Sequence, residues 1–221
     1  MKSIILSVQP QWLAKILNGE KTIEIRKSAP KELPCEVYLY CTMGKPYLNQ
    51  HKGTPFEDGQ LHTSCILQDC PLNFEEHTSK HLSAINLNGK VVAKFTLNKV
   101  EEVGLTLHTK KISDYFVGEK DHIVINKVEE YIYDELEGTC LTVDELHAYG
   151  KGEPLSAWHI DNLVIFDKPM ELGEFQSPTF LERPFDLSKL KDGETITFHQ
   201  WRQKAIITRA PQSFCYCEPI K

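Results

Sequence analysis

Three ionic side chains lie within six residues near the start of the chain, at Lys21, Glu24 and Arg26. Lysine offers a mobile ammonium charge, arginine a planar fork of donors, and glutamate an acceptor that can orient either cation or take a proton. Such a group suits a small polar ligand, above all an anionic one. On residue types alone the simpler interpretation is a solvated strand face, whose exposed pairs each contribute at most about 1 kcal/mol.

A short helix and a strand are predicted to position these residues. Apolar spacing predicts a helix over residues 11–18, with Pro10 at the first helical position and Gly19 at the cap after the last turn. The apolar face of this helix consists of Trp12, Leu13, Ile16 and Leu17. In the strand that follows, two isoleucines alternate with polar residues, so Glu24 and Arg26 are predicted to share the face opposite the core.

A family resemblance gives these residues more weight. Gly19, Lys21, Glu24 and Arg26 match the G-x-K-x-x-E-x-R motif of the ASCH family, named for activating signal cointegrator homology, which resembles the PUA domain of RNA-modifying proteins. Two later stretches, 157–160 and 211–216, are similar to the ends of phage and prophage ASCH proteins. The resemblance implies an α+β fold with a PUA-like mixed β-barrel flanked by short helices, forming a single domain over residues 1–221.

The resemblance also implies two functional classes. ASCH and PUA-like domains look like binders of RNA or nucleotides, whereas a small bacterial ASCH group is an amidohydrolase that removes the acetyl group from N-acetylated cytidine, and some members are ribonucleases. In the amidohydrolases the resemblance implies an activating lysine, matched by Lys21, and a threonine nucleophile at the position that Glu24 occupies here. An acyl-enzyme route through a hydroxyl therefore has no candidate at that position. Hydrolysis would need Glu24 as a general base toward water.

We therefore expect binding of RNA or a modified nucleotide in a cleft beside residues 21–26. Lys21 and Arg26 would contact an anionic or carbonyl group, and Glu24 would orient them or accept from a base amino group. A hydrolase acting on a modified nucleoside, or a ribonuclease, is the alternative. A protein-interaction module with residues 44–88 as its partner surface is the third interpretation.

Other candidate ligand-binding residues lie later in the chain. Trp158 could stack on a base, or His159 could face the ligand, but neighbouring side chains of a strand point to opposite sides, so both should not do so. The alternatives are an apolar anchor and a surface histidine. A polar cluster near the last strand could meet phosphate or form a solvated rim. It consists of Lys204, Arg209, Gln212 and Ser213.

A metal site is a further possibility in a stretch rich in turn residues. Scattered glycine and proline predict that residues 44–88 form a long loop insertion. Within it, Cys65, Cys70, His77 and His81 offer four thiolate or imidazole ligands, the set that structural zinc prefers. Solvated loop histidines are the competing interpretation, and no other cofactor is expected.

Charge and composition limit the kinds of partner. The net charge of −6 argues against a broad, sequence-blind grip on nucleic acid, because that grip needs clustered lysine and arginine. The apolar run from Ile4 to Val8 is far shorter than a signal-peptide core or the roughly 20 residues of a membrane helix. Seven widely spaced cysteines fit a reducing compartment. We expect a cytoplasmic protein with no membrane partner.

The remaining pattern predicts further elements. A strand that is apolar on both faces, 37–41, should be central to a sheet, with Cys41 as a small core residue. Alternation predicts a strand over 89–100, helical spacing predicts a helix over 126–136, and Thr142 with Glu145 forms a capping box for a helix ending near Gly150. Strands are also predicted over 158–166, 195–198, 205–209 and 213–218.

Overall fold

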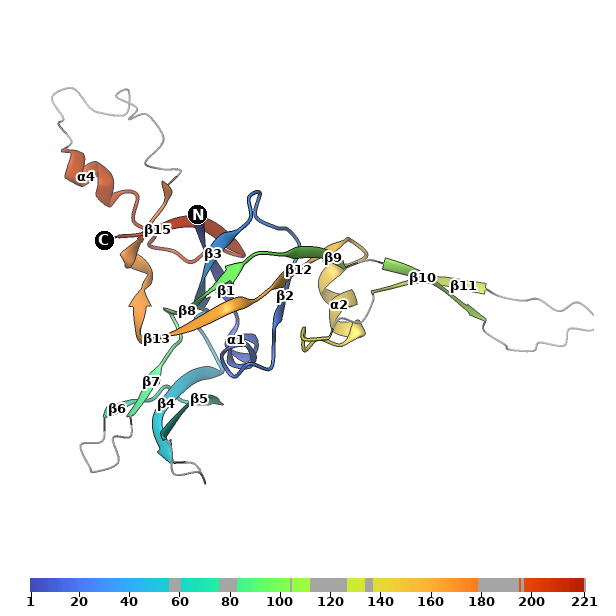
Figure 1. Cartoon of the computed structure of the whole chain (residues 1–221), viewed down its shortest axis with the longest axis horizontal. Helices are drawn as coiled ribbons and strands as arrows, with labels where there is room; N and C mark the ends of the chain where they lie inside the picture. Colours follow the sequence, from blue (N-terminus) through green and yellow to red (C-terminus); the bar gives the residue numbers. More distant parts are fainter. Residues whose placement is uncertain are drawn as a thin grey trace, which may run out of the picture. The chain divides into compact units, whose positions relative to one another are not determined.

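The chain was analysed as a computed structural model, in which two compact units are distinguished (Figure 1). The structure describes residues 1–55, 61–75, 83–103, 105–111, 127–133, 137–178, 195 and 197–220. Unit 1 comprises residues 1–22, 30–99 and 159–221, and unit 2 comprises residues 23–29 and 100–158. The single domain over residues 1–221 stays a prediction.

Unit 1 contains a six-stranded mixed sheet. Its strands, in spatial order, are β13 (Asp161–Glu171), β8 (Lys90–Leu97), β3 (Cys35–Cys41), β1 (Lys2–Val8), β15 (Phe214–Pro219) and β14 (Phe175–Gln176). The two central strands β1 and β3 run parallel, and every other neighbouring pair is antiparallel. With its short helices, this curled sheet confirms the prediction of an α+β, barrel-like fold.

The central strands are apolar on both faces because both faces of the sheet are covered. Ile4, Ile5 and Leu6 of β1 are fully buried, as are Val37, Leu39 and Cys41 of β3. This confirms the prediction for the strand over 37–41. One core cluster consists of Ile5, Tyr38, Tyr40, Val91, Phe175, Ile207 and Cys217.

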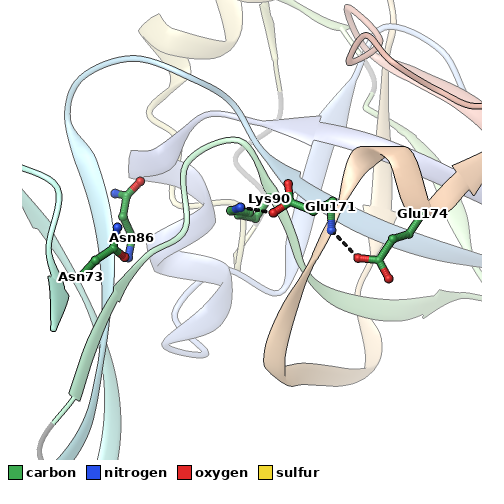
Figure 2. Close-up of polar contacts among 5 residues, drawn as sticks. All are labelled: Asn73, Asn86, Lys90, Glu171 and Glu174. Carbon is green, nitrogen blue, oxygen red and sulfur yellow. Dashed lines mark hydrogen bonds and ion pairs between the residues drawn. The ribbon is translucent and has the colours of Figure 1, made fainter. Parts of the chain in front are cut away.

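The edge of this sheet is tied by a charged pair. Lys90 of β8 and Glu171 of β13 are cross-strand neighbours, and the lysine ammonium pairs with the Glu171 carboxylate (Figure 2). The backbone N–H of Glu171 donates to Oε1 of Glu174 at 2.7 Å, where the 3-10 helix η1 (Leu172–Glu174) begins. Figure 2 also shows Asn73 beside Asn86, whose backbone N–H donates to Oδ1 of Asn73 at 3.1 Å.

A second sheet of unit 1 lies where a loop was predicted. The described part of residues 44–88 forms β4 (Tyr47–Pro55), β5 (Leu61–Gln68), β6 (Asn73–Glu75) and β7 (Ser83–Asn86), in the order β5-β4-β7-β6. The prediction of a loop was wrong for these residues. The strands are short and carry buried amides instead of a regular apolar face, so periodicity did not reveal them.

Unit 2 is built around a three-stranded sheet. Its order is β2 (Ile23–Arg26), β12 (Leu155–His159) and β9 (Val100–Val103). Leu146 of α2 (Val143–Gly150) packs in one core cluster with Ile23, Ile25 and Leu155. The predicted capping box is present, because Thr142 Oγ1 accepts from the Glu145 N–H at 3.2 Å and the Glu145 carboxylate accepts from the Thr142 N–H at 2.9 Å.

Three further predictions of secondary structure were wrong. The described part of 126–136 forms β11 (Lys127–Tyr133), which pairs antiparallel with β10 (Leu105–Lys111) along seven residues of each strand (Figure 1). In place of a strand over 195–198, Thr197 accepts from the Gln200 N–H and opens the helix α4 (Phe198–Gln203). Residues 205–209 contribute one isolated bridge, from Ile206 to Gln176.

The strand predicted over 158–166 is divided between β12 and β13, with Ile160 between them. The strands predicted over 89–100 and 213–218 are confirmed as β8 and β15, with small differences at their ends. In the part of the chain that the structure describes, no helix is long and apolar enough to cross a membrane.

Candidate functional site

The first half of the motif lies at the end of α1 (Pro10–Leu17), in unit 1. Gly19 has φ +78°, the left-handed conformation that glycine adopts without strain. The Gly19 N–H donates to the Ile16 carbonyl at 3.0 Å and the Glu20 N–H donates to the Lys15 carbonyl at 2.9 Å, which together form a Schellman motif. The Gly19 and Pro10 predictions are confirmed. This motif turns the chain back along the last turn of the helix.

The turn brings Lys21 back beside α1. Its backbone N–H also donates to the Lys15 carbonyl, at 3.0 Å, and the residue is only 2% exposed. Its ammonium lies 5.7 Å from the centroid of the Trp12 ring, and the ammonium of Lys15 lies 5.2 Å from the same centroid. The electron-rich face of an indole attracts cations at such distances. One indole therefore gathers two positive charges.

Trp12 was predicted to belong to the apolar face of the helix. Leu13, Ile16 and Leu17 are buried, as predicted, but Trp12 is partly exposed. Its ring lies toward the side of the helix that carries Lys15, three residues further on, because residues at this spacing share a helix face. The tryptophan is thus an amphipathic surface group beside the motif, which the apolar pattern did not indicate.

The second half of the motif lies on β2, in unit 2. Ile23 and Ile25 are buried in the core of this unit, and the Ile23 N–H donates to the Gly138 carbonyl at 3.0 Å. Glu24 and Arg26 share the other face, as predicted, and their side chains pair at 2.8 Å between Glu24 Oε1 and an Arg26 terminal nitrogen. The two residues are 6% and 9% exposed. This strand face is therefore covered and is not an ordinary solvated one.

The chemistry of the two halves can be stated separately. In unit 1 the site offers a nearly buried ammonium next to a partly exposed indole. In unit 2 it offers a guanidinium fork whose orientation is fixed by a carboxylate. Burying such groups costs free energy, and an ion pair removed from water repays the cost only with good geometry and further hydrogen bonds. The structure thus brings Glu24 together with Arg26 and brings Lys21 together with Trp12 and Lys15.

The candidates of the later segments differ in exposure. Trp158 on β12 is fully buried, as expected for an apolar anchor, while His159 is partly exposed and its backbone N–H donates to the Lys99 carbonyl at 3.1 Å. Both remain predicted ligand residues. The difference agrees with the expectation that they point to opposite sides of the strand.

The polar cluster near the last strand lies in unit 1. Lys204, Arg209 and Gln212 are exposed, and Ser213 is partly exposed. The Ser213 carbonyl accepts from the backbone N–H of Ser7 at 2.9 Å, so this serine is fixed to the end of β1. These exposures fit the solvated-rim interpretation, and contact with phosphate stays a prediction.

The predicted zinc ligands are only partly within the described residues. Cys65 is buried on β5, and burial raises the pKa of its thiol to about 11, whereas Cys70 is exposed. His77 and His81 lie outside the described residues. Among the described residues, no group of three or more histidine, cysteine or acidic side chains is placed to hold a metal ion. Because zinc binds the thiolate, Cys65 would have to lose a proton on binding. The zinc site stays a prediction.

Trp12 and Lys15 are the functional candidates that sequence reasoning missed. A signal was present, because a tryptophan followed three residues later by a lysine places an aromatic ring and a cation on one helix side. The apolar count of the helix outweighed it. The part of the signal that could not be read from spacing is the return of Lys21 to the same ring.

Comparisons with known proteins give structural matches only. No family model matches the chain, and no curated protein matches it significantly. The structure is similar to a crystal structure of a tyrosine-to-phenylalanine mutant of ASCH from Zymomonas mobilis, with a TM-score of 0.44 and 10% identity over 98% of this chain and 90% of that one. It is also similar to a crystal structure of ASCH from the same organism, with a TM-score of 0.43 and 12% identity over 97% of this chain and 87% of that one. The sequence motif and these structures name the same family, ASCH.

Proposed function

We propose that this chain binds RNA or a nucleotide at the segment from Gly19 to Arg26. The observation that supports this most is the burial of all three ionic residues of the segment, Lys21, Glu24 and Arg26, each less than 10% exposed. Charged residues are rarely buried, and buried ion pairs contribute little to stability on balance. A ligand that meets these groups gives their burial a purpose.

The residue types favour a nucleotide over an apolar ligand. An ammonium and a guanidinium suit phosphate or carbonyl oxygens, and arginine can bind them through two parallel hydrogen bonds. A carboxylate can accept from a base amino group. Because the whole chain carries a net charge of −6, attraction of phosphate must be local to such a segment.

The test is a binding and turnover panel of nucleosides, nucleotides and short RNAs. Wild type is compared with Lys21→Met, which keeps most of the apolar stem but removes the charge, and with Lys168→Met, which removes an exposed lysine of β13. We expect Lys21→Met to weaken retention about 10- to 100-fold, the usual effect of losing a charged hydrogen bond. Lys168→Met should bind like wild type. Thermal unfolding of each variant checks that the fold is retained.

Each result has a defined meaning. Retention of a probe without product supports binding, and product that disappears in Lys21→Met would establish the hydrolase alternative. Binding that weakens with salt indicates phosphate contacts. If wild type retains none of the probes, or if both variants bind as wild type does, the proposal is wrong.

A further inference from the structure

We infer that Trp12 and Lys15 form a second nucleotide subsite on α1, so that the ligand is a single-stranded oligonucleotide and not an isolated nucleotide. A base would stack on the exposed part of the Trp12 indole, and the Lys15 ammonium would contact a neighbouring phosphate. This inference rests on the proposed function, because the first nucleotide would occupy the motif.

The first support is the concentration of charge at one ring. Among the described residues, Tyr38, Tyr149 and Tyr216 each have one lysine ammonium within 6 Å of the ring centroid. Trp12 has two, at 5.2 and 5.7 Å. Two ammonium groups so close repel each other, and an anion beside them would relieve that repulsion.

The second support is the exposure of the ring. Trp12 is partly exposed on a helix whose other large apolar residues are buried, so its indole keeps surface that a ligand could cover. Aromatic platforms beside basic groups are the means by which proteins bind single strands, because every base has a stacking face and every nucleotide a phosphate. Such a subsite would act without a strongly basic surface.

The third support is the connection of this ring to the motif. The Lys15 carbonyl accepts from the N–H groups of Glu20 and Lys21, so the subsite and the motif lysine share one hydrogen-bonded turn. The ammonium of Lys21 lies beside the same ring as that of Lys15. A base on Trp12 would therefore lie next to whatever group Lys21 contacts. The natural occupant of adjacent positions is a chain of nucleotides.

The experiment compares mononucleotides with tetranucleotides. The probes are the four nucleoside 5′-monophosphates and the four single-base RNA tetranucleotides, and the proteins are wild type, Trp12→Leu, Trp12→Phe, Lys15→Met and the control Lys168→Met. We expect Trp12→Leu to weaken tetranucleotide binding about 5- to 100-fold and to leave mononucleotide binding unchanged. Trp12→Phe keeps an aromatic face and should retain most of the affinity. Lys15→Met should lower the slope of log affinity against log salt by about 0.7.

The outcomes separate this inference from the proposed function. Wild type that binds mononucleotides, with equal tetranucleotide binding in wild type and Trp12→Leu, overturns the subsite and leaves the proposed function standing. Wild type that binds no probe overturns both. Should Trp12→Leu fail to fold, Trp12→Phe and Lys15→Met decide: a loss of salt slope with retained affinity in Trp12→Phe supports the subsite, and an unchanged slope overturns it. Quenching of tryptophan fluorescence by tetranucleotide should be lost in Trp12→Phe.

Discussion

The two sheets of unit 1 are held together by different kinds of contact. The six-stranded sheet is stabilised by apolar side chains, and Leu6, Leu39 and Phe95 are each at most 1% exposed. The four-stranded sheet is joined by buried amides, above all Asn49 and Asn88, which are 0% and 8% exposed. Apolar burial is non-directional, whereas an amide must meet each of its partners at the right geometry.

The amides of the four-stranded sheet bind backbone that is far apart in sequence. Asn88 accepts from the Leu48 N–H at 2.8 Å and donates to the carbonyls of Gly44 and Pro46 at 2.7 and 3.2 Å. Asn49 donates to the Cys70 carbonyl at 3.0 Å and accepts from a backbone N–H of the same segment. Removing one such side chain leaves several buried groups unpaired at once, so the two sheets should respond differently to truncation.

The largest effect is expected in the apolar sheet. Phe95→Ala removes a fully buried ring of β8 and should lower the free energy of unfolding by about 3–5 kcal/mol, because it loses apolar burial and leaves a cavity. Phe95→Leu, which keeps more of the volume, should cost less. Urea unfolding followed by circular dichroism measures both. Equal costs for the two variants would show that the core collapses around the change.

A somewhat smaller effect is expected for Asn88→Ala. The substitution leaves the Leu48 N–H and two carbonyls without their partner, and it should cost about 2–3 kcal/mol. The matched control is Asn98→Ala, an exposed asparagine whose amide donates to Asp161, which should change stability by no more than about 0.5 kcal/mol. Hydrogen exchange should show lost protection in β4. Similar costs for both asparagines would contradict the role of the amide network.

A charged cluster tests the apolar sheet by pH. Burial alone would raise the pKa of the Glu36 carboxyl, but hydrogen bonds from Lys94 at 2.6 Å and Tyr38 at 2.7 Å, with the lysine charge, lower it below 4.5. A folded-state pKa below the unfolded one stabilises the fold fully above 4.5 and progressively less as the pH falls through the folded value.

Lys94→Met should therefore reduce stability by about 1 kcal/mol near neutral pH, and the difference from wild type should shrink as the solution is acidified below the ordinary carboxyl pKa. Unfolding curves over a pH series measure it. Because Tyr38 still donates to Glu36 in this variant, part of the acid sensitivity should remain. A difference that grows on acidification would mean that the sign is wrong.

The smallest effect is expected at the pair shown in Figure 2. Lys90→Met removes the ammonium that pairs with Glu171, but both side chains are substantially exposed, so the change should stay within about 0.5 kcal/mol. High salt should abolish what difference there is. A cost comparable with that of Asn88→Ala would place this edge among the main supports of unit 1.

The same contrast explains which elements could be predicted. The strands over 37–41 and 89–100 follow from apolar alternation, and α2 follows from its capping box. The four-stranded sheet could not be predicted, because amide partners such as Asn88 and Gly44 lie over forty residues apart and leave no periodic trace. Residues 126–136 were misread because Val128, Tyr131 and Ile132 also fit a strand, whose partner lies elsewhere in the chain.

The site was predictable to a similar extent. The motif and the alternation indicated that Glu24 and Arg26 share a strand face, and the structure pairs them. Their burial could not be predicted, because it depends on what covers the strand. Trp12 was assigned to the apolar face, since spacing does not tell which residue at a helix border will meet the returning chain.

The glycine that ends α1 has a consequence for transplanting this motif. Because its left-handed turn and the Lys15 carbonyl set where the motif lysine goes, the eight letters from Gly19 to Arg26 are not a portable unit. A scaffold designer would have to graft the last two helical turns with them. Lengthening the helix by a single residue would swing the lysine about 100° around the axis and carry it off the indole.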